Sequence, residues 1–316
     1  MHKVIFDTDP GVDDAMALLF LERHPDVELI GITTAFGNAS IETTTRNAQY
    51  LKQQWGLSAP IAKGSAEQYD PARITHPFPV GIHGHDGLGN IGVPDVVDVP
   101  LDPRPAHQFI IDAIKANPGE IVLVAVGRMT NLANALKAAP EIAGLVKEVV
   151  IMGGAVDVPG NVTPAAEANI HGDPEAADAV MIAPWKVVVV GLDVTLKTTM
   201  SRAKLAELAA SGGEAVQLLD RLSQFYIDFY DGQVPGSMVV HDTCACVYLV
   251  APELFTVRAG PVRVLTTGIG EGKTIQKPDG KVFGPSEWDN LPSQLVCTDV
   301  KAAEVMALIE ETLVGR

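Results

Sequence analysis

Short apolar runs alternate with longer amphipathic stretches over most of the chain, and this alternation predicts strands followed by helices. The runs typical of strands lie at residues 4–6, 27–33, 59–62, 120–126, 149–152 and 187–191. The stretches with helical spacing lie at about residues 14–24, 40–55, 104–116, 131–138, 174–182, 202–210, 214–230, from 242 onward and at 300–313. Such alternation predicts an α/β fold with a doubly wound, mostly parallel, Rossmann-like sheet flanked by helices.

Other stretches lack a clear period. The longest, residues 64–100, is rich in Gly, Pro and His, and a loop of this length inside a compact domain is usually functional. Residues 158–169 are also irregular, and a loop is expected at 233–240. Short strands are expected within residues 257–283, with a hairpin turn at Lys277-Pro278-Asp279-Gly280.

Composition narrows the classes of protein. The chain has 316 residues, 47% of them hydrophobic, which is enough to bury a large core. No linker, repeat or low-complexity tract divides it, so we expect residues 1–316 to form a single domain. The formal net charge of −16 argues against nucleic acid or an anionic membrane as a partner, and no apolar run reaches membrane-spanning length. Three cysteines without paired spacing fit a reducing compartment, so we expect a cytoplasmic protein without a targeting leader.

An acidic stretch ends the first predicted strand and carries four aspartates, Asp7, Asp9, Asp13 and Asp14, within eight positions. Carboxylates are favoured at a helix N-terminus, which accounts for one or two of them in a well-capped helix. Four neighbouring anions repel one another and are costly to bury, so a bound cation is the better explanation. Oxygen donors without Cys or His favour Ca²⁺ or Mg²⁺ over Zn²⁺.

Further polar residues follow other predicted strands or open helices, namely Asn38, Asn161, Glu167, Asn169, His241 and Asp242. Taken singly, each fits a turn or a helix cap. Together they converge on the carboxyl edge of one sheet, where ligands bind in this fold class. Amides and carboxylates are suited to binding a neutral polyol on a metal, whereas binding of a phosphate would require basic residues or a Gly-rich turn. For cleavage of a glycosidic bond, Asp9 would be the base and His241 would help the leaving group.

The acidic stretch through Ala15 resembles the signature of the calcium-dependent nucleoside hydrolases (nucleoside N-ribohydrolases). Later segments match the family in order: Gly37-Asn38, His83-Gly84, Met129 to Ala133, Met152-Gly153-Gly154, Glu167 to Ile170, Asp173 to Ala177 and His241-Asp242. The resemblance covers nearly the whole chain. It implies the nucleoside hydrolase fold and hydrolysis of the N-glycosidic bond of ribonucleosides to free base and ribose.

The resemblance also implies roles for individual residues. One Ca²⁺ per chain would be bound by Asp9, Asp14, Asp242 and the carbonyl of Val126, with Asp9 also the base and Asp7 behind them. His241 would be the candidate acid. The 2′- and 3′-hydroxyls would be held by Asp13, Asn38 and Asn169, and the 5′-hydroxyl by Asn161, Glu167 and Asn169. The remaining expected substrate contacts are His83, Met152, Tyr226 and Tyr230.

The chain departs from the family pattern at three positions, where Val126, Arg128 and Ala168 replace the common Thr, Pro and Phe. His241 points to the branch that accepts inosine and uridine or pyrimidine nucleosides, and the family implies a homodimer or homotetramer. Two alternatives stay open at this point. One is a Mg²⁺-dependent phosphatase with Asp7 as nucleophile, and the other is a nucleoside- or ribose-binding protein without activity.

Overall fold

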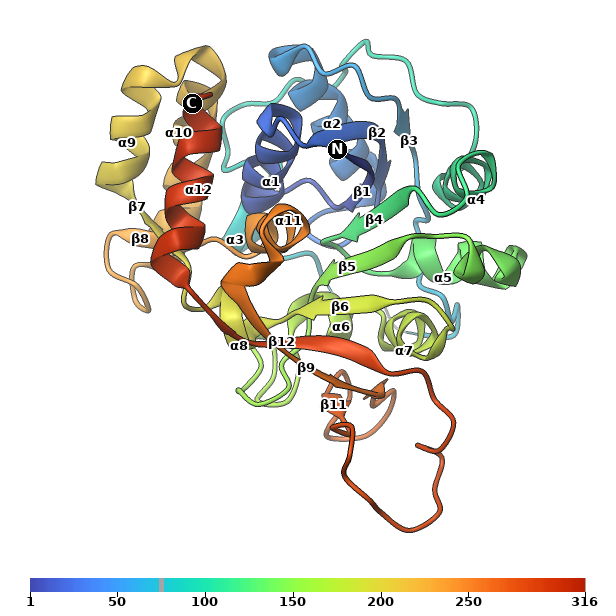
Figure 1. The fold of residues 1–316 in the computed structure, drawn as a ribbon. Coiled ribbons are helices and arrows are strands. Elements are labelled where there is room, and N and C mark those ends of the chain that lie inside the picture. The colour runs from blue at the N-terminus through green and yellow to red at the C-terminus, as the bar shows by residue number, and fades with distance from the viewer. Residues whose placement is uncertain (74–76, 316) are drawn as a thin grey trace.

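A computed structural model describes residues 1–73 and 77–315 and contains one eight-stranded sheet in the order β3-β2-β1-β4-β5-β6-β12-β9 (Figure 1). Neighbouring strands are parallel except at the β12–β9 edge, which is antiparallel. The predicted doubly wound, mostly parallel α/β fold is therefore confirmed. The strands of this sheet are β1 (His2–Thr8), β2 (Val27–Thr34), β3 (Ile61–Ala62), β4 (Ile121–Ala125), β5 (Glu148–Met152), β6 (Val187–Val190), β9 (Phe255–Gly260) and β12 (Gln294–Val300).

Helices cover both faces of the sheet (Figure 1). The longer ones are α1 (Val12–Arg23), α2 (Ile41–Trp55), α4 (Ala106–Ala116), α5 (Thr130–Ala138), α7 (Pro174–Ile182), α9 (Arg202–Ser211), α10 (Gly213–Tyr230), α11 (Asp242–Val250) and α12 (Ala302–Val314). The short ones are α3 (Val80–His83), α6 (Ala168–Gly172), α8 (Leu192–Thr195), and the 3-10 turns Pro140–Gly144 and Pro252–Leu254. Two small antiparallel pairs complete the fold, β7 (Thr199–Ser201) with β8 (Ser237–Val239) and β10 (Val262–Val264) with β11 (Thr274–Gln276).

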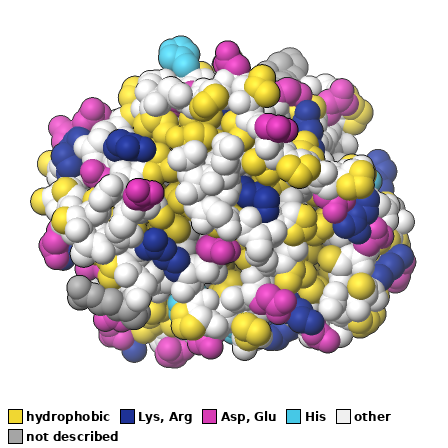
Figure 2. Space-filling model, turned by 90° about the horizontal axis from the view of Figure 1, so that it is seen from above, with side chains coloured by type: hydrophobic (Ala, Val, Ile, Leu, Met, Phe, Trp, Pro, Cys, Tyr) yellow, Lys and Arg dark blue, Asp and Glu magenta, His cyan; other side chains and the backbone are white. Residues whose placement is uncertain are grey.

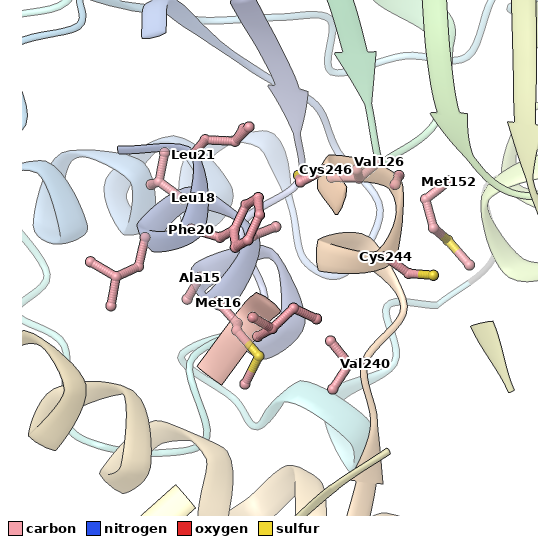
Figure 3. Close-up of a cluster of buried hydrophobic side chains, with 14 of the residues drawn as sticks. Ala15, Met16, Leu18, Phe20, Leu21, Val126, Met152, Val240, Cys244 and Cys246 are labelled. Atoms are coloured by element: carbon pink, nitrogen blue, oxygen red, sulfur yellow. The ribbon is translucent and has the colours of Figure 1, made fainter. Parts of the chain in front are cut away.

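The core has two layers because successive strand side chains point to opposite faces. In β4, Val122 and Val124 pack with α1 and α11, whereas Leu123 and Ala125 pack with α4, α5 and α7. Helix α1 is buried from Val12 to Leu21. Figure 3 shows its side chains beside Val126, Met152 and the α11 cysteines. A helix that is apolar all round belongs in the interior, so its N-terminal carboxylates are held inside the protein.

Two expectations are wrong, and one strand was not predicted. The expected loop at 233–240 contains β8. The turn at Lys277–Gly280 does not close a hairpin, because β10 pairs with β11 and their connection is residues 265–273. Strand β12 was not predicted, although it joins β6 and β9 within the sheet. Its first residue, Gln294, is buried, accepts from the Val187 amide at 2.8 Å and donates to the Met181 carbonyl at 2.9 Å. A buried glutamine with satisfied hydrogen bonds hides the apolar pattern by which a central strand is recognised.

Charged side chains of both signs are interspersed over the face seen in Figure 2. Among the described residues, no helix is both long and apolar enough to cross a membrane.

Candidate active site

A cavity of about 550 Å³ opens at the carboxyl ends of β1, β2, β4 and β5. Most residues that the sequence analysis assigned to catalysis, substrate or metal line it: Asp9, Asp13, Asn38, His83, Val126, Met152, Asn161, Glu167, Asn169, Tyr226, Tyr230, His241 and Asp242. Asp14 is the exception, since it is buried and is not part of the lining. Strands and helices separated by more than 200 residues thus contribute to one site.

Asp9 is held in one orientation with one carboxylate oxygen left over. Its Oδ2 accepts from the amide of Asn38 at 2.7 Å, whereas its buried Oδ1 has no hydrogen-bond partner among the described residues. Gly37 and Gly127 approach the carboxylate so closely that a Cβ at either position would collide with it. The turns after β2 and β4 therefore need glycine here, and they confine the group that was expected to act as base.

Asp14 accepts four hydrogen bonds. Its Oδ1 accepts from Thr8 Oγ1 at 2.5 Å and from the Asp9 amide at 3.2 Å. Its Oδ2 accepts from the Gly11 amide and from Asn38 Nδ2, both at 2.9 Å. This carboxylate closes the N-terminus of α1 and ties the turn after β1 to the turn after β2.

The carboxylates of Asp13, Asp14 and Asp242 form a cluster in which each has an oxygen within 4.8 Å of the others. The expected metal set contained Asp9 in place of Asp13, so the structure adds Asp13 to the candidate ligands. Burial, followed by repulsion between neighbouring carboxylates, raises the pKa of Asp9, Asp13 and Asp242. Asp13 Oδ1 is also buried without a partner. Crowded, under-bonded carboxylates of this kind fit a hard divalent cation.

Asp7 lies behind the cavity and is fully buried. Its Oδ2 accepts from Thr33 Oγ1 at 2.5 Å and from Asn131 Nδ2 at 2.8 Å, and burial raises its pKa to about 7. A carboxylate enclosed in this way cannot reach a phosphoryl group, so the geometry does not favour the phosphatase alternative.

Helix α6 organises the polar wall next to β5. Glu167 caps it, with Oε1 accepting from the Asn169 amide at 2.9 Å and Oε2 from the Ile170 amide at 3.1 Å and the Gly154 amide at 2.9 Å. Asn169 Nδ2 donates to the carbonyl of Val126 at 2.7 Å. The first turn of α6 therefore orients the Glu167 carboxylate and the Asn169 amide, which face the cavity. Through Asn169 it also orients the Val126 carbonyl, a candidate metal ligand.

His241 and Tyr230 form a hydrogen-bonded pair on another wall. The His241 Nε2 lies 2.9 Å from the Tyr230 hydroxyl, and its Nδ1 lies 2.9 Å from Thr195 Oγ1. Burial lowers the pKa of His241 to about 4, so the ring is neutral at pH 7. A neutral imidazole has one N–H, and its two partners decide which nitrogen carries it.

Tyr226 and His83 border the same region. The Tyr226 hydroxyl donates to Asp13 Oδ2 at 3.2 Å, and its ring centroid lies 5.2 Å from that of His83. His83 Nδ1 accepts from the Val12 amide at 3.3 Å, and burial lowers its pKa to about 3. These rings give the cavity an aromatic side on which a planar base can pack.

Sequence reasoning missed several residues of the site. Thr195 reaches His241 from a short helix whose role no local pattern indicates. Arg128 was noted only as a departure, yet it lines the cavity, lies 4.5 Å from the Phe36 ring centroid and has a buried Nη1 to which no residue in 1–73 or 77–315 is hydrogen-bonded. Ala168, also noted only as a departure, lines the cavity too, and the remaining lining residues that were not assigned a role are Gly37, Pro77, Pro79, Ile82, Val162, Thr163, His171 and Gly172.

Comparisons with known proteins agree with this geometry. The model of the family "Inosine-uridine preferring nucleoside hydrolase" matches residues 4–307. The chain is 39% identical to "Probable uridine nucleosidase 1" of Oryza sativa subsp. japonica, covering 99% of this chain and 97% of the relative. It is 37% identical to the "Inosine-uridine preferring nucleoside hydrolase" of Leishmania major, covering 85% and 86% of the two chains.

Among solved structures, a plant nucleoside hydrolase, the PpNRh1 enzyme, superimposes with a TM-score of 0.95 at 36% identity, covering 100% of this chain and 99% of that one. The chain therefore belongs to the inosine-uridine preferring nucleoside hydrolase family and is a ribonucleoside hydrolase.

Proposed function

We propose that this enzyme hydrolyses the N-glycosidic bond of uridine and inosine, with Asp9 as general base and His241 assisting the departing base. The observation that carries the proposal is the pairing, within one cavity, of a confined carboxylate that has a free oxygen with a buried His–Tyr pair. The names of the relatives support the choice of uridine and inosine.

Ribose is held by the polar walls of the cavity. Asp13 and Asn38, which line the cavity, bind the 2′- and 3′-hydroxyl side in this proposal, together with the Asn169 amide. Asn161 and Glu167 take the 5′-hydroxyl, and Met152 packs beside them. Each carboxylate accepts from a hydroxyl and each amide donates or accepts, which suits a neutral sugar.

We propose one Ca²⁺ per chain, held by Asp13 or Asp9, Asp14, Asp242 and the Val126 carbonyl. All these donors are oxygens, and the partnerless oxygens of Asp9 and Asp13 fit ligands of such a cation. When bound, the cation supplies positive charge that orients the diol and lowers the pKa of water. The chain's own task is to take the proton, which Asp9 Oδ1 does from the attacking water.

The leaving base is uncharged before cleavage and gains electron density as the bond to C1′ breaks. His241 and Tyr230 share a hydrogen bond, so one of them presents a proton toward the base while the other stabilises the donor. His83 and Tyr226 pack against the base and exclude water. Transfer of this proton to the base neutralises the negative charge that develops on it, which lowers the barrier for departure.

The test is steady-state hydrolysis of uridine, inosine, cytidine and adenosine with Ca²⁺ present. We expect release of reducing sugar, with kcat/KM highest for uridine or inosine. Asp9→Ala should abolish turnover while leaving the melting temperature near that of the wild type. Binding of ribose by calorimetry without any turnover would instead support the non-catalytic alternative.

We further propose that residues 1–316 form a single domain, because the one sheet joins β1 from the start of the chain to β12 near its end. We propose a homodimer or homotetramer, which light scattering on purified protein would test. A cytoplasmic location is proposed on the three free, buried cysteines, which need a reducing compartment to stay unmodified.

A further inference from the structure

The β10–β11 hairpin, residues 262–276, reaches the active-site wall from the far edge of the sheet, beyond β9 (Figure 1). Lys273, just before β11, donates through Nζ to the carbonyls of Ala155 at 2.6 Å and Val156 at 3.0 Å. These carbonyls belong to the segment that follows β5. A half-buried ammonium that bonds two main-chain carbonyls holds that segment in one position.

The segment held by Lys273 is the one that supports Glu167. The preceding amide, that of Gly154, donates to Glu167 Oε2 at 2.9 Å. On the other side, Asp193 in α8 accepts from the amides of Val156 and Asp157 at 3.0 and 2.7 Å. Lys273 thus binds the carbonyls, and Asp193 the amides, of the short segment that follows Gly154. This segment adjoins the hydrogen bond from the Gly154 amide that orients the Glu167 carboxylate.

The two residues that flank Lys273 pack against the two segments that hold Glu167. A Cβ on Gly154 would lie 2.9 Å from Thr274 Oγ1, so β11 packs directly on the residue that donates to Glu167. A Cβ on Gly272 would lie 2.7 Å from the Ala166 Cβ, next to the start of α6. Three consecutive residues of the hairpin therefore support both the segment that donates to Glu167 and the start of α6, which Glu167 caps.

We propose that Lys273 is a positioning residue for the 5′-hydroxyl subsite, acting through the Gly154 amide on Glu167. This inference rests on the proposed assignment of Glu167 to the 5′-hydroxyl. A small shift of the segment moves the Glu167 carboxylate, and a misplaced acceptor loses its hydrogen bond to the substrate. The reacting centre at C1′ is bonded by other residues, so the effect is confined to substrates that carry a 5′-hydroxyl.

The experiment compares uridine with 5′-deoxyuridine in the wild type, Lys273→Met and Lys273→Arg. We expect Lys273→Met to lower kcat/KM about tenfold for uridine, the equivalent of one lost hydrogen bond, mostly through KM. For 5′-deoxyuridine the change should stay below about twofold, because the hydroxyl that senses the shift is absent. Lys273→Arg, which keeps the donors, should recover part of the loss.

Lys277→Met is the matched control, since this lysine directly follows β11 and its Nζ lies 3.3 Å from Asp289 rather than at the active-site wall. It should leave both substrates unchanged. An equal loss on uridine and 5′-deoxyuridine in a folded Lys273→Met protein would overturn the inference. A wild type that treats the two substrates alike would instead contradict the 5′-hydroxyl assignment, so the two failures are distinguishable. If Lys273→Met does not fold, Lys273→Gln is measured by the same comparison.

Discussion

Gly127→Ala tests whether the position of the Asp9 carboxylate limits the rate. Gly127 does not have a left-handed backbone, so alanine is conformationally allowed there. Its Cβ would nevertheless lie 2.5 Å from Asp9 Oδ1, whereas ordinary contact begins at 3.4 Å. The carboxylate must therefore move by about 0.9 Å, or the turn after β4 must give way by the same amount. The new Cβ meets the carboxylate at Oδ1, to which no described residue donates, so no hydrogen bond opposes the displacement of that oxygen.

A displacement of about 1 Å from reactive geometry costs about 100-fold in rate, which corresponds to about 2.7 kcal/mol of transition-state stabilisation. We expect kcat for uridine to fall by about this factor. The KM should change little, because the groups proposed to bind ribose are on other turns. The assay is the initial rate of reducing-sugar release, with the melting temperature measured on the same samples.

Gly144→Ala is the matched control, since a Cβ there meets nothing within 4 Å. It should leave kcat and KM unaltered, and Asp9→Ala gives the lower limit of the rate. A Gly127→Ala enzyme that is folded and within threefold of the wild-type kcat would refute the reasoning. In that case either the turn yields without moving Asp9, or Asp9 does not take the proton.

Three further predictions follow from named contacts. Thr195→Val removes the partner of His241 Nδ1 and should lower kcat about tenfold at constant Ca²⁺ affinity, whereas Thr195→Ser should retain most of the activity. Asn131→Leu deprives buried Asp7 of a donor and should lower the free energy of unfolding by about 1–3 kcal/mol in urea titrations. Chelation of divalent cations should abolish turnover, and the stripped protein should melt at a lower temperature at pH 8 than at pH 6. The folded-state pKa values of Asp13 and Asp242 are raised, so the stability that protonation contributes is lost as pH rises through them. Equal melting temperatures at the two pH values would contradict the conclusion that Asp13 and Asp242 carry buried, uncompensated charge in the stripped protein.

Several elements were predictable because their signal is local. Helix α1 and strands β4 to β6 have apolar runs that can be recognised in the sequence without knowledge of their tertiary contacts. Strand β12 was missed, since its pattern depends on a buried glutamine that bonds to segments more than 100 residues away. Strand β8 was missed because three residues beside a loop carry too little periodicity to be recognised.

The sequence by itself determined the alternation of strands and helices over most of the chain, the acidic turn after β1 and the set of polar residues expected at one edge. Those properties follow from residue type and spacing, which local backbone geometry turns into strands, turns and caps. Only the tertiary structure decided how the four aspartates differ. Asp7 is enclosed by β2 and α5 outside the cavity, Asp14 accepts four hydrogen bonds, and Asp9 and Asp13 line the cavity, each with one oxygen to which no described residue donates. The physical reason is that a carboxylate's role depends on which groups, distant in sequence, desolvate it and donate to it.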